Sequence, residues 1–292
     1  MIELRNVFYS VPAPNGARRL IVDDVSLSIE AHTITCLMGT SGCGKTTLLR
    51  LMAGLIRPDA GEVLIFGEDI AHMRERDVNK IRREMGFVFQ YSALFDSLSV
   101  AENIAFGLER QKTPKKQMRQ TVTTLLQEVG LPGIGDKYPA ELSGGMRKRV
   151  AMARALATNP KVVLYDEPDS GLDPVMTSVV NELLVEMRDT KGTTNVVVSH
   201  NVDAIWRVAD RVLMFNAGKI VADGTPAEVQ ACDSDVVQQF IKGLSHGPLH
   251  QDKDFGKKEE AKKRGLKLRL PVSMPTMPTL PHFRKEKNSK RE

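Results

Sequence analysis

The residues with the most specific chemistry lie between Gly39 and Thr46, where the chain reads Gly-Thr-Ser-Gly-Cys-Gly-Lys-Thr. This fits the phosphate-binding pattern G-x-x-x-x-G-K-[ST] and follows the apolar run 34–38, so it predicts a loop between a buried strand and a helix. Backbone N–H groups of such a loop point at phosphate oxygens, Lys45 adds charge near the β and γ phosphates, and Thr46 offers a hydroxyl to Mg²⁺. The alternative is a glycine-rich turn that binds nothing. We expect the nucleotide-binding residues to be Gly39, Thr40, Ser41, Gly42, Cys43, Gly44, Lys45, Thr46 and Thr47.

Two adjacent carboxylates, Asp166 and Glu167, follow the apolar run 162–165. A phosphate loop of this kind needs a second Mg²⁺ ligand at the end of a buried strand adjacent to the phosphate strand, and we assign that role to Asp166. Glu167 is then placed to polarise a water in line with the γ phosphate, as a general base or an orienting acceptor. The alternative is a strand end with two solvated charges, which Pro168 and the matching loop disfavour.

Residues 142–146, Leu-Ser-Gly-Gly-Met, form a second candidate anion site. The Ser143 hydroxyl, the small residues Gly144 and Gly145, and the start of a helix over 147–157 are all suited to a phosphate. Ser143 as a simple helix cap is the alternative, but a cap needs no glycine pair. A phosphate-seeking helix end separate from the first loop indicates that it completes the site of another subunit. We therefore expect a dimer.

The elements that hold these groups alternate between strands and helices. We expect strands over residues 2–8, 25–30, 63–66, 85–90, 162–165 and 195–198 and helices over 45–55, 94–131 (an interrupting helical block), 150–157 and 175–188, with turns at 12–16 and 57–62. Alternation of this kind predicts an α/β fold with a mostly parallel sheet flanked by helices, preceded by an N-terminal antiparallel β edge. Ligands of such sheets bind at the carboxyl ends of the strands, which is where Gly39, Gln90, Asp166 and His200 fall.

Composition fits a soluble globular protein of one or two domains, because 41% of the 292 residues are hydrophobic and 26% are charged. No run of about 18 apolar residues is present, and the N-terminus lacks a signal-peptide pattern, so we expect the chain neither to span a membrane nor to be secreted. Cys36, Cys43 and Cys232 have no metal-type spacing and are interpreted as reduced thiols of a cytosolic protein.

The net charge of +5 is unevenly distributed along the chain. From Leu249 onward 13 lysines and arginines face 6 acidic residues, a net of +7, so residues 1–248 carry −2. Residues 247–292 are therefore a basic tail, with a proline at every third position from 275 to 281 that favours an extended spacer. A flexible solvated tail is the first interpretation. The other is that the Leu/basic segment 266–270 binds an anionic membrane or the edge of a partner's sheet.

Several motifs occur in a specific order along the chain. They are residues 39–46, Gln90, 142–146, 162–167, 170–173 (Ser-Gly-Leu-Asp) and His200. This series resembles the nucleotide-binding subunits of ABC transporters, over about residues 1–245. The resemblance implies a P-loop NTPase core with an inserted ABC helical subdomain at about 91–155, so that residues 1–246 form the ABC ATP-binding domain. ATP and Mg²⁺ are the expected ligands.

The resemblance also implies roles for individual residues. A head-to-tail homodimer would sandwich two ATP molecules, with Ser143 and Gly145 of one subunit facing the γ phosphate bound by residues 39–46 of the other. Asp173 would make a contact across the dimer. Taken alone, His200 would more often be a capping or core histidine, but the order of motifs makes it the γ-phosphate switch. Gln90 would sense Mg²⁺ and water. The expected catalytic residues are thus Glu167, His200, Gln90 and Lys45, and the expected metal ligands are Thr46, Gln90 and Asp166.

One family feature is missing from this chain. An aromatic residue usually stacks on adenine four residues after the valine of the first strand, and here that position is Val11, while Tyr9 lies two residues earlier. The two share a face if the strand is regular. Adenine therefore rests on an apolar platform at Val11, or Tyr9 substitutes.

Two segments resemble the ATPase subunits of MCE/Mla-type lipid transporters, namely residues 90–100 and 236–248. The chain departs from the best-known Mla form at 169–172 and in its tail. The resemblance implies ATP hydrolysis that drives a separate integral membrane permease dimer to move phospholipid, with MCE-type and small accessory subunits as further partners. The place of work would be cytoplasmic, peripheral on the inner face of the cytoplasmic membrane.

Two alternatives remain open at the level of sequence. The first is the ATPase of an importer for a small polar solute. The second is a soluble ABC ATPase acting on nucleic acid or ribosomes, but such proteins usually carry a long coiled coil or two ATP modules, so no nucleic acid partner is expected.

Overall fold

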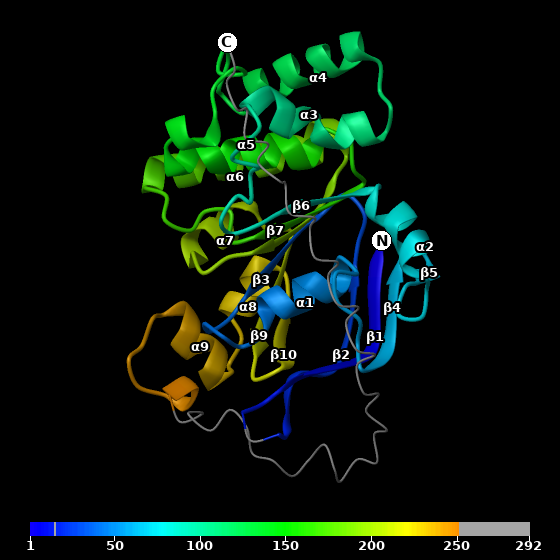
Figure 1. Cartoon of the computed structure of the whole chain (residues 1–292). Coiled ribbons are helices and arrows are strands. Elements are labelled where there is room, and N and C mark those ends of the chain that lie inside the picture. Colours follow the sequence, from blue (N-terminus) through cyan, green and yellow to red (C-terminus); the bar gives the residue numbers. More distant parts are fainter. Residues whose placement is uncertain (15, 251–292) are drawn as a thin grey trace, which may run out of the picture.

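The computed structural model describes residues 1–14 and 16–250, which fold into two sheets and their flanking helices (Figure 1). The strands are β1 (Ile2–Pro12), β2 (Arg18–Ile29), β3 (Ile34–Met38), β4 (Ala60–Ile65), β5 (Glu68–Asp69), β6 (Met85–Val88), β7 (Val162–Asp166), β8 (Thr194–Val198), β9 (Arg211–Asn216) and β10 (Lys219–Gly224). The helices are α1 (Lys45–Met52), α2 (Glu75–Arg82), α3 (Val100–Arg110), α4 (Lys115–Glu128), α5 (Gly144–Leu156), α6 (Pro174–Lys191), α7 (Val202–Val208), α8 (Pro226–Gln230) and α9 (Asp235–Ile241). Two 3₁₀ turns are η1 (Pro139–Glu141) and η2 (Pro248–His250).

The larger sheet has the order β10-β9-β3-β8-β7-β6, and every pair from β9 to β6 is parallel. Strands β3, β7 and β8 are buried at every position, as expected for strands covered on both faces. The predicted mostly parallel sheet is therefore confirmed. The expectation that β7 lies next to the phosphate strand is wrong, because β8 is inserted between β3 and β7.

The N-terminal antiparallel strands form a sheet of their own, in the order β2-β1-β4-β5. Helix α1 lies between the two sheets and packs against β2 and β4 on one side and β7 and β8 on the other. Its buried side chains Leu48, Leu49, Leu51 and Met52 belong to the hydrophobic core that joins the sheets. Burial of this apolar surface is what holds the phosphate loop at the junction of the two sheets.

The other face of the large sheet is covered by α5 and α6, and α3 and α4 lie beyond α5 (Figure 1). Helix α3 begins at Val100 because Ser99 and Glu102 form a reciprocal capping box. The preceding loop is held by Asn103, whose amide donates to the carbonyls of Phe95, Leu98 and Ser99. The predicted helical block 94–131 is confirmed as two helices that start later and end earlier than expected.

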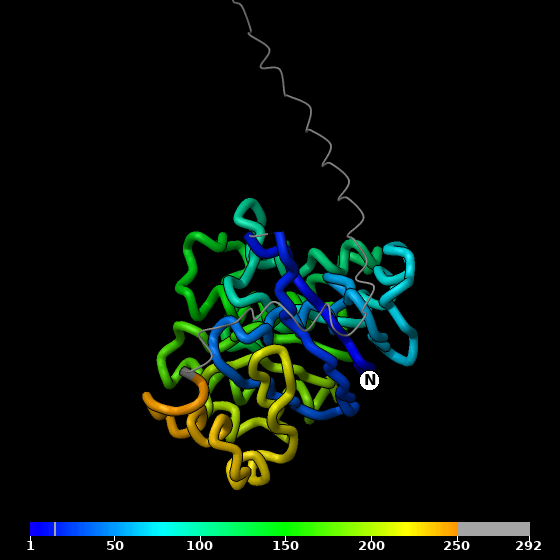
Figure 2. Tube along the Cα trace, turned by 90° about the horizontal axis from the view of Figure 1, so that it is seen from below, coloured from blue at the N-terminus to red at the C-terminus, as the bar shows by residue number. Residues whose placement is uncertain are grey.

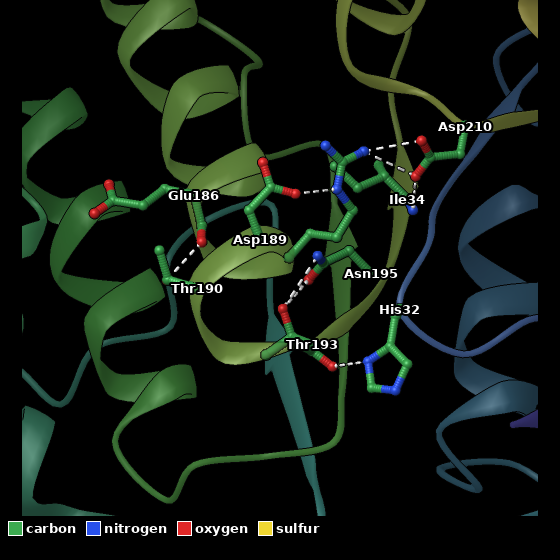
Figure 3. A network of polar contacts seen from close by, with 10 residues as sticks. His32, Ile34, Glu186, Asp189, Thr190, Thr193, Asn195 and Asp210 are labelled. Atoms are coloured by element: carbon green, nitrogen blue, oxygen red, sulfur yellow. Dashed lines mark hydrogen bonds and ion pairs between the residues drawn. The ribbon is translucent and has the colours of Figure 1, made fainter.

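A polar network at the amino ends of β3 and β8 stabilises the side of the sheet opposite the phosphate loop (Figure 3). Arg188 joins Asp189 at 2.7 Å and Asp210 at 2.9 Å, and Asp210 in turn accepts from the backbone N–H of Ile34 at 2.8 Å. His32 Nδ1 lies 2.5 Å from the carbonyl of Gly192. These contacts tie the end of α6 to β3.

Several elements were not predicted. These include α2, α7, α8, α9, β5, β9 and β10, of which β10, α8 and α9 gather at one edge of the molecule (Figure 2). The predicted strand 85–90 ends at Val88, and β4 begins at Ala60, inside the predicted turn. No helix among residues 1–14 and 16–250 has the length and apolar character needed to cross a bilayer. The predictions for the tail beyond residue 250 lie outside the described residues.

Candidate active site

The loop after β3 depends on a glycine at position 39. Gly39 has a φ of 147°, and a Cβ atom at this position would lie 2.0 Å from the carbonyl oxygen of Phe215 on β9. No larger residue fits without moving β9 away from β3. From Gly39 the chain crosses an exposed tip at Ser41 and Gly42 before Lys45 starts α1. The amino end of α1 therefore follows directly on the loop, as the phosphate-binding pattern predicts.

Lys45 is buried within this loop, with 4% of its surface exposed. Its Nζ donates to the carbonyls of Gly39 and Thr40, both at 2.9 Å. Burial lowers the pKa of the Lys45 ammonium, while nearby thiol and carboxyl groups, Cys43 first, oppose that shift. The side chain thus closes the loop on itself and carries the charge that a phosphate would attract.

Thr46 and Asp166 meet at the base of the loop, where the Thr46 hydroxyl donates to Asp166 Oδ1 at 2.8 Å. Burial raises the pKa of the Asp166 carboxyl, and the hydrogen bond from Thr46 opposes that rise. A buried carboxylate beside a hydroxyl is a pair of hard oxygen donors, which suits Mg²⁺. The two residues therefore fit a Mg²⁺ site that is completed by phosphate oxygens and water.

Glu167, Gln90 and His200 form a cluster beside this pair. Gln90 Nε2 donates to Glu167 Oε2 at 2.7 Å, and His200 Nε2 lies 2.6 Å from Glu167 Oε1. The Glu167 side chain is 15% exposed and that of His200 is 39% exposed. Both oxygens of one carboxylate are thus held by residues from two different strand ends, so its orientation is fixed. A carboxylate held in this way can accept a proton from a water on its exposed side.

Ser143 and Asp173, which are predicted to act across a dimer, lie at the amino ends of α5 and α6. Ser143 is exposed and caps α5, with its hydroxyl accepting from the N–H of Met146 at 3.2 Å. Asp173 is exposed and caps α6, accepting from the N–H of Met176 at 2.9 Å. Gly145 lies beside Leu172 and Met176. Among the described residues no hydrogen bond joins Ser143, Gly144 or Asp173 to the phosphate loop of the same chain.

A sequence model of the family described as ABC transporter matches residues 22–170. This chain belongs to that family. It is an ATPase, the ATP-binding subunit of a transporter. Of the ABC motifs found in the sequence, the fold brings Thr46, Asp166, Glu167, Gln90 and His200 together beside the phosphate loop, whereas Ser143 and Asp173 cap helices elsewhere on the surface.

Curated relatives of this ABC subunit fall into two groups. The intermembrane phospholipid transport system ATP-binding protein MlaF of Haemophilus influenzae is 37% identical over 250 residues, which are 85% of this chain and 93% of the relative. The Escherichia coli K12 protein of the same name is 39% identical over 85% of this chain and 91% of the relative. The methionine import ATP-binding protein MetN of Geobacillus kaustophilus is 41% identical over 84% of this chain and 71% of the relative.

Solved ABC cassettes have the same fold. A dimeric structure of the ATP-binding cassette MJ0796, in a post-hydrolysis state bound to ADP and Pi, matches with a TM-score of 0.73 and 29% identity. The match covers 77% of this chain and 99% of that one. The expected P-loop NTPase fold is thereby confirmed for the ABC domain.

The predicted adenine platform lies on the first strand of this ABC domain. Tyr9 and Val11 are both partly buried and pack against the core between the two sheets, to which Ile21 and Cys43 also belong. Ser10 points the other way, where its hydroxyl donates to Asp59 at 2.6 Å. The pairing of β1 with β2 shifts register on both sides of Tyr9, so the strand is not regular here, but Tyr9 and Val11 pack against the same core and remain joint candidates for the adenine contact.

Two basic residues on α5, Arg154 and Lys148, were not given a role from the sequence. Arg154 donates to the carbonyls of Ser92 and Ala93, and Lys148 donates to the carbonyls of Glu167 and Ser170. Lys148 is buried, and so are most residues of the second half of α5. Because Arg147 and Arg149 have the same spacing from buried residues as Lys148, no local pattern in the sequence distinguishes Lys148 from its neighbours.

Proposed function

We propose that this ABC ATPase powers phospholipid transport through a separate membrane permease. The observation that carries the proposal is coverage: the MlaF proteins match over 91–93% of their own length. Importer ATPases are somewhat more identical, up to 45% for the sulfate/thiosulfate importer CysA of Synechococcus elongatus, but that match covers 59% of the relative. Identity within the nucleotide-binding core is common to all such ATPases, so a match over nearly the full length of the relative discriminates better.

Hydrolysis in this proposal uses the groups of the loop and of the ends of β6, β7 and β8. Lys45 and the backbone of residues 39–46 would hold the β and γ phosphates, and Thr46 and Asp166 would hold Mg²⁺, with Gln90 as the further expected ligand. Bound Mg²⁺ supplies neutralising charge to the phosphates. Glu167 orients the attacking water and accepts its proton, while Gln90 and His200 keep the carboxylate aligned.

The active unit in this proposal is a homodimer. Ser143, Gly144 and Asp173 are exposed at the ends of α5 and α6 and are free to meet a nucleotide bound by a second copy. Val175 beside Asp173 is 72% exposed, which suits a surface that a partner covers. The solved cassettes to which the chain is similar are described as dimeric, and this supports the same arrangement here.

The surface that would contact the permease lies after Gln90. Tyr91 is 87% exposed and Phe95 is 43% exposed, and the Phe95 ring packs against Phe106 of α3 with the centroids 4.6 Å apart and the rings tilted by 41°. A groove of about 670 Å³ runs between α3 and α4, with apolar lining from Ala105, Met118, Val122 and Leu126. These features suit a helix inserted from a membrane subunit. The chain would then sit peripherally on the cytoplasmic face of the inner membrane, with MCE-type and accessory subunits completing the system.

The test is to purify the full-length protein with the membrane partner that accompanies it and to identify bound molecules by mass spectrometry. The complex is then reconstituted, and ATP-dependent transfer of a fluorescent phospholipid is measured beside uptake of methionine and sulfate. Phospholipid transfer that stops in a Glu167→Gln variant supports the proposal. Uptake of a polar solute without lipid transfer would favour the importer. Salt-sensitive RNA binding without any membrane partner would favour a soluble ABC ATPase.

A further inference from the structure

Lys148 is a buried lysine on α5, with 8% of its surface exposed. Its Nζ donates to the carbonyl of Glu167 at 3.2 Å, to the hydroxyl of Ser170 at 3.0 Å and to the carbonyl of Ser170. An ammonium has three N–H donors, so these acceptors match its full capacity. Burial lowers the pKa of Lys148, and the charges of Asp169 and Glu167 oppose that shift. A buried cation is stable only where hydrogen-bond acceptors replace its lost hydration, so Lys148 and its acceptors fix each other's positions.

The acceptor segment begins at a strained residue. Glu167 has a φ of 51°, in the left-handed region that residues with a side chain rarely adopt. Its N–H donates to the carbonyl of Val198 on β8 at 2.9 Å, and its carbonyl accepts from Lys148. Strained backbone persists where the surroundings fix it, and it often occurs at functional sites. Here the strained turn aims the Glu167 carboxylate at Gln90 and His200 instead of along β7.

The same segment is linked to the strand end that carries His200. Asp169 accepts from the Ser199 hydroxyl at 2.8 Å, and Ser170 is held by Lys148. Helix α5, on which Lys148 lies, has Ser143 as its N-terminal cap. One side chain therefore connects the helix headed by Ser143 to the backbone of Glu167.

We propose that Lys148 is a positioning residue for ATP hydrolysis, which holds the backbone of Glu167 and Ser170 in a fixed place relative to α5. The inference rests on the proposed role of Glu167 as the residue that orients the water. Through this contact, displacement of α5 displaces the Glu167 carboxylate, so the carboxylate is aligned only when the helix headed by Ser143 is in place.

The experiment compares variants of the full-length protein in the assembly in which it purifies. Lys148→Met keeps the length of the side chain and removes the donors, and Lys148→Arg keeps donors and charge. The matched control is Arg149→Met, because Arg149 also donates from α5 to carbonyls, but to those of Val129 and Gly130. We measure kcat, KM for ATP, the melting temperature, and the same quantities with Glu167→Gln added.

We expect Lys148→Met to lower kcat by about 30- to 100-fold with KM changed less than about twofold, because a small misplacement of a reacting group has an effect of this size. Lys148→Arg should recover about tenfold of that loss, and Arg149→Met should leave kcat within about twofold even if it melts lower. On top of Glu167→Gln, Lys148→Met should reduce the residual rate by less than about threefold, since both changes act on one group.

The inference is overturned if Lys148→Met keeps wild-type kcat, if Arg149→Met lowers kcat equally, or if the Lys148 effect is undiminished beside Glu167→Gln. Where the methionine variant does not accumulate, Lys148→Gln replaces it in the same cycle, because its amide keeps a donor. If instead Glu167 does not orient the water, Glu167→Gln alone, with Lys148 intact, turns over ATP at the normal rate.

Discussion

Gln90 and Glu167 are separated by 77 residues in the chain, and a hydrogen bond of 2.7 Å joins their side chains. The bond connects the end of β6, next to the exposed Tyr91, with the carboxylate at the end of β7. We therefore expect a movement of the loop at Tyr91 to shift the Glu167 carboxylate through this bond.

Glu167→Gln should keep the bonds to Gln90 and His200 in altered form and remove the proton acceptor. We expect kcat to fall by about 100-fold or more, with ATP binding retained, because general bases contribute 10²–10⁴-fold. Size-exclusion chromatography with ATP should show an accumulated dimer. Lys45→Ala is the contrasting variant, and nucleotide binding by calorimetry should be lost there. Normal turnover by Glu167→Gln would assign water activation to another group.

Asp166→Asn should stabilise the nucleotide-free protein while abolishing Mg²⁺-dependent turnover. Burial raises the pKa of Asp166 above its ordinary 3.8, so the stability contributed by the neutral form is present below the unfolded pKa and lost as pH rises through the folded one. At pH 7 the asparagine variant has no buried carboxylate to ionise, so this loss of stability is absent, and its amide oxygen still accepts from Thr46. We expect a melting temperature higher by about 2–4 °C, for roughly 1 kcal/mol.

The pH dependence of the melting temperature checks this prediction. The difference between Asp166→Asn and wild type should grow from pH 4 to pH 7 in differential scanning fluorimetry. Asp173→Asn is the control, since asparagine caps a helix as well as aspartate and Asp173 is exposed. A variant that melts below the wild type at pH 7 contradicts the prediction.

The adenine platform can be assigned by changing Tyr9 and Val11 separately. Val11→Phe adds an aromatic ring beside the core against which both pack, and stacking of about 0.5–1.5 kcal/mol should lower the KM for ATP by about two- to tenfold with kcat unchanged. Tyr9→Ala should raise KM. Val221→Phe on β10 provides an exposed valine as control. If Tyr9→Ala has no effect on KM while Val11→Ala raises it, Val11 alone forms the platform.

Asn103→Ala tests the loop that precedes α3. The side chain is fully buried, donates to three carbonyls and accepts from the N–H of Phe95 at 2.8 Å. Leaving these groups without partners should lower the free energy of unfolding by about 2–4 kcal/mol. Asn79→Ala on the exposed face of α2 should change it by less than about 0.5 kcal/mol, as is usual for surface positions. Urea denaturation measures both, and equal midpoints would contradict the structural role of Asn103.

The parts of the fold that the sequence predicted are those with strong local patterns. The runs at β3, β7 and β8 are apolar and fully buried, so residue type alone was enough to predict them as strands. Helix α2 was missed because Val78 and Ile81 are its only buried apolar residues, which is too few for a periodic pattern. Strand β9 has a buried apolar run of the same kind at residues 212–215, but it was not assigned from the sequence.

The sequence names candidate site residues, which stay predictions, but it does not show the contacts between them. Spacing identified Lys45, Asp166 and Glu167, since each follows a motif with a known physical role. The insertion of β8 between β3 and β7, and the bonds from Gln90 and His200 to one carboxylate, are properties of the tertiary fold. Lys148 was missed for the same reason, because its acceptors lie about 20 residues further along the chain.

The 2.0 Å gap between a Cβ at position 39 and the Phe215 carbonyl also bears on how inactive variants should be interpreted. We expect replacement of Gly39 to disrupt the pairing of β3 with β9, and so to destabilise the fold whether or not nucleotide is bound. A genetic screen scored on transport would group such replacements with those of Glu167, whereas a measurement of protein abundance in the same cells would separate them. Variants at Gly39 would disappear through degradation, and those at Glu167 would accumulate as intact but idle protein.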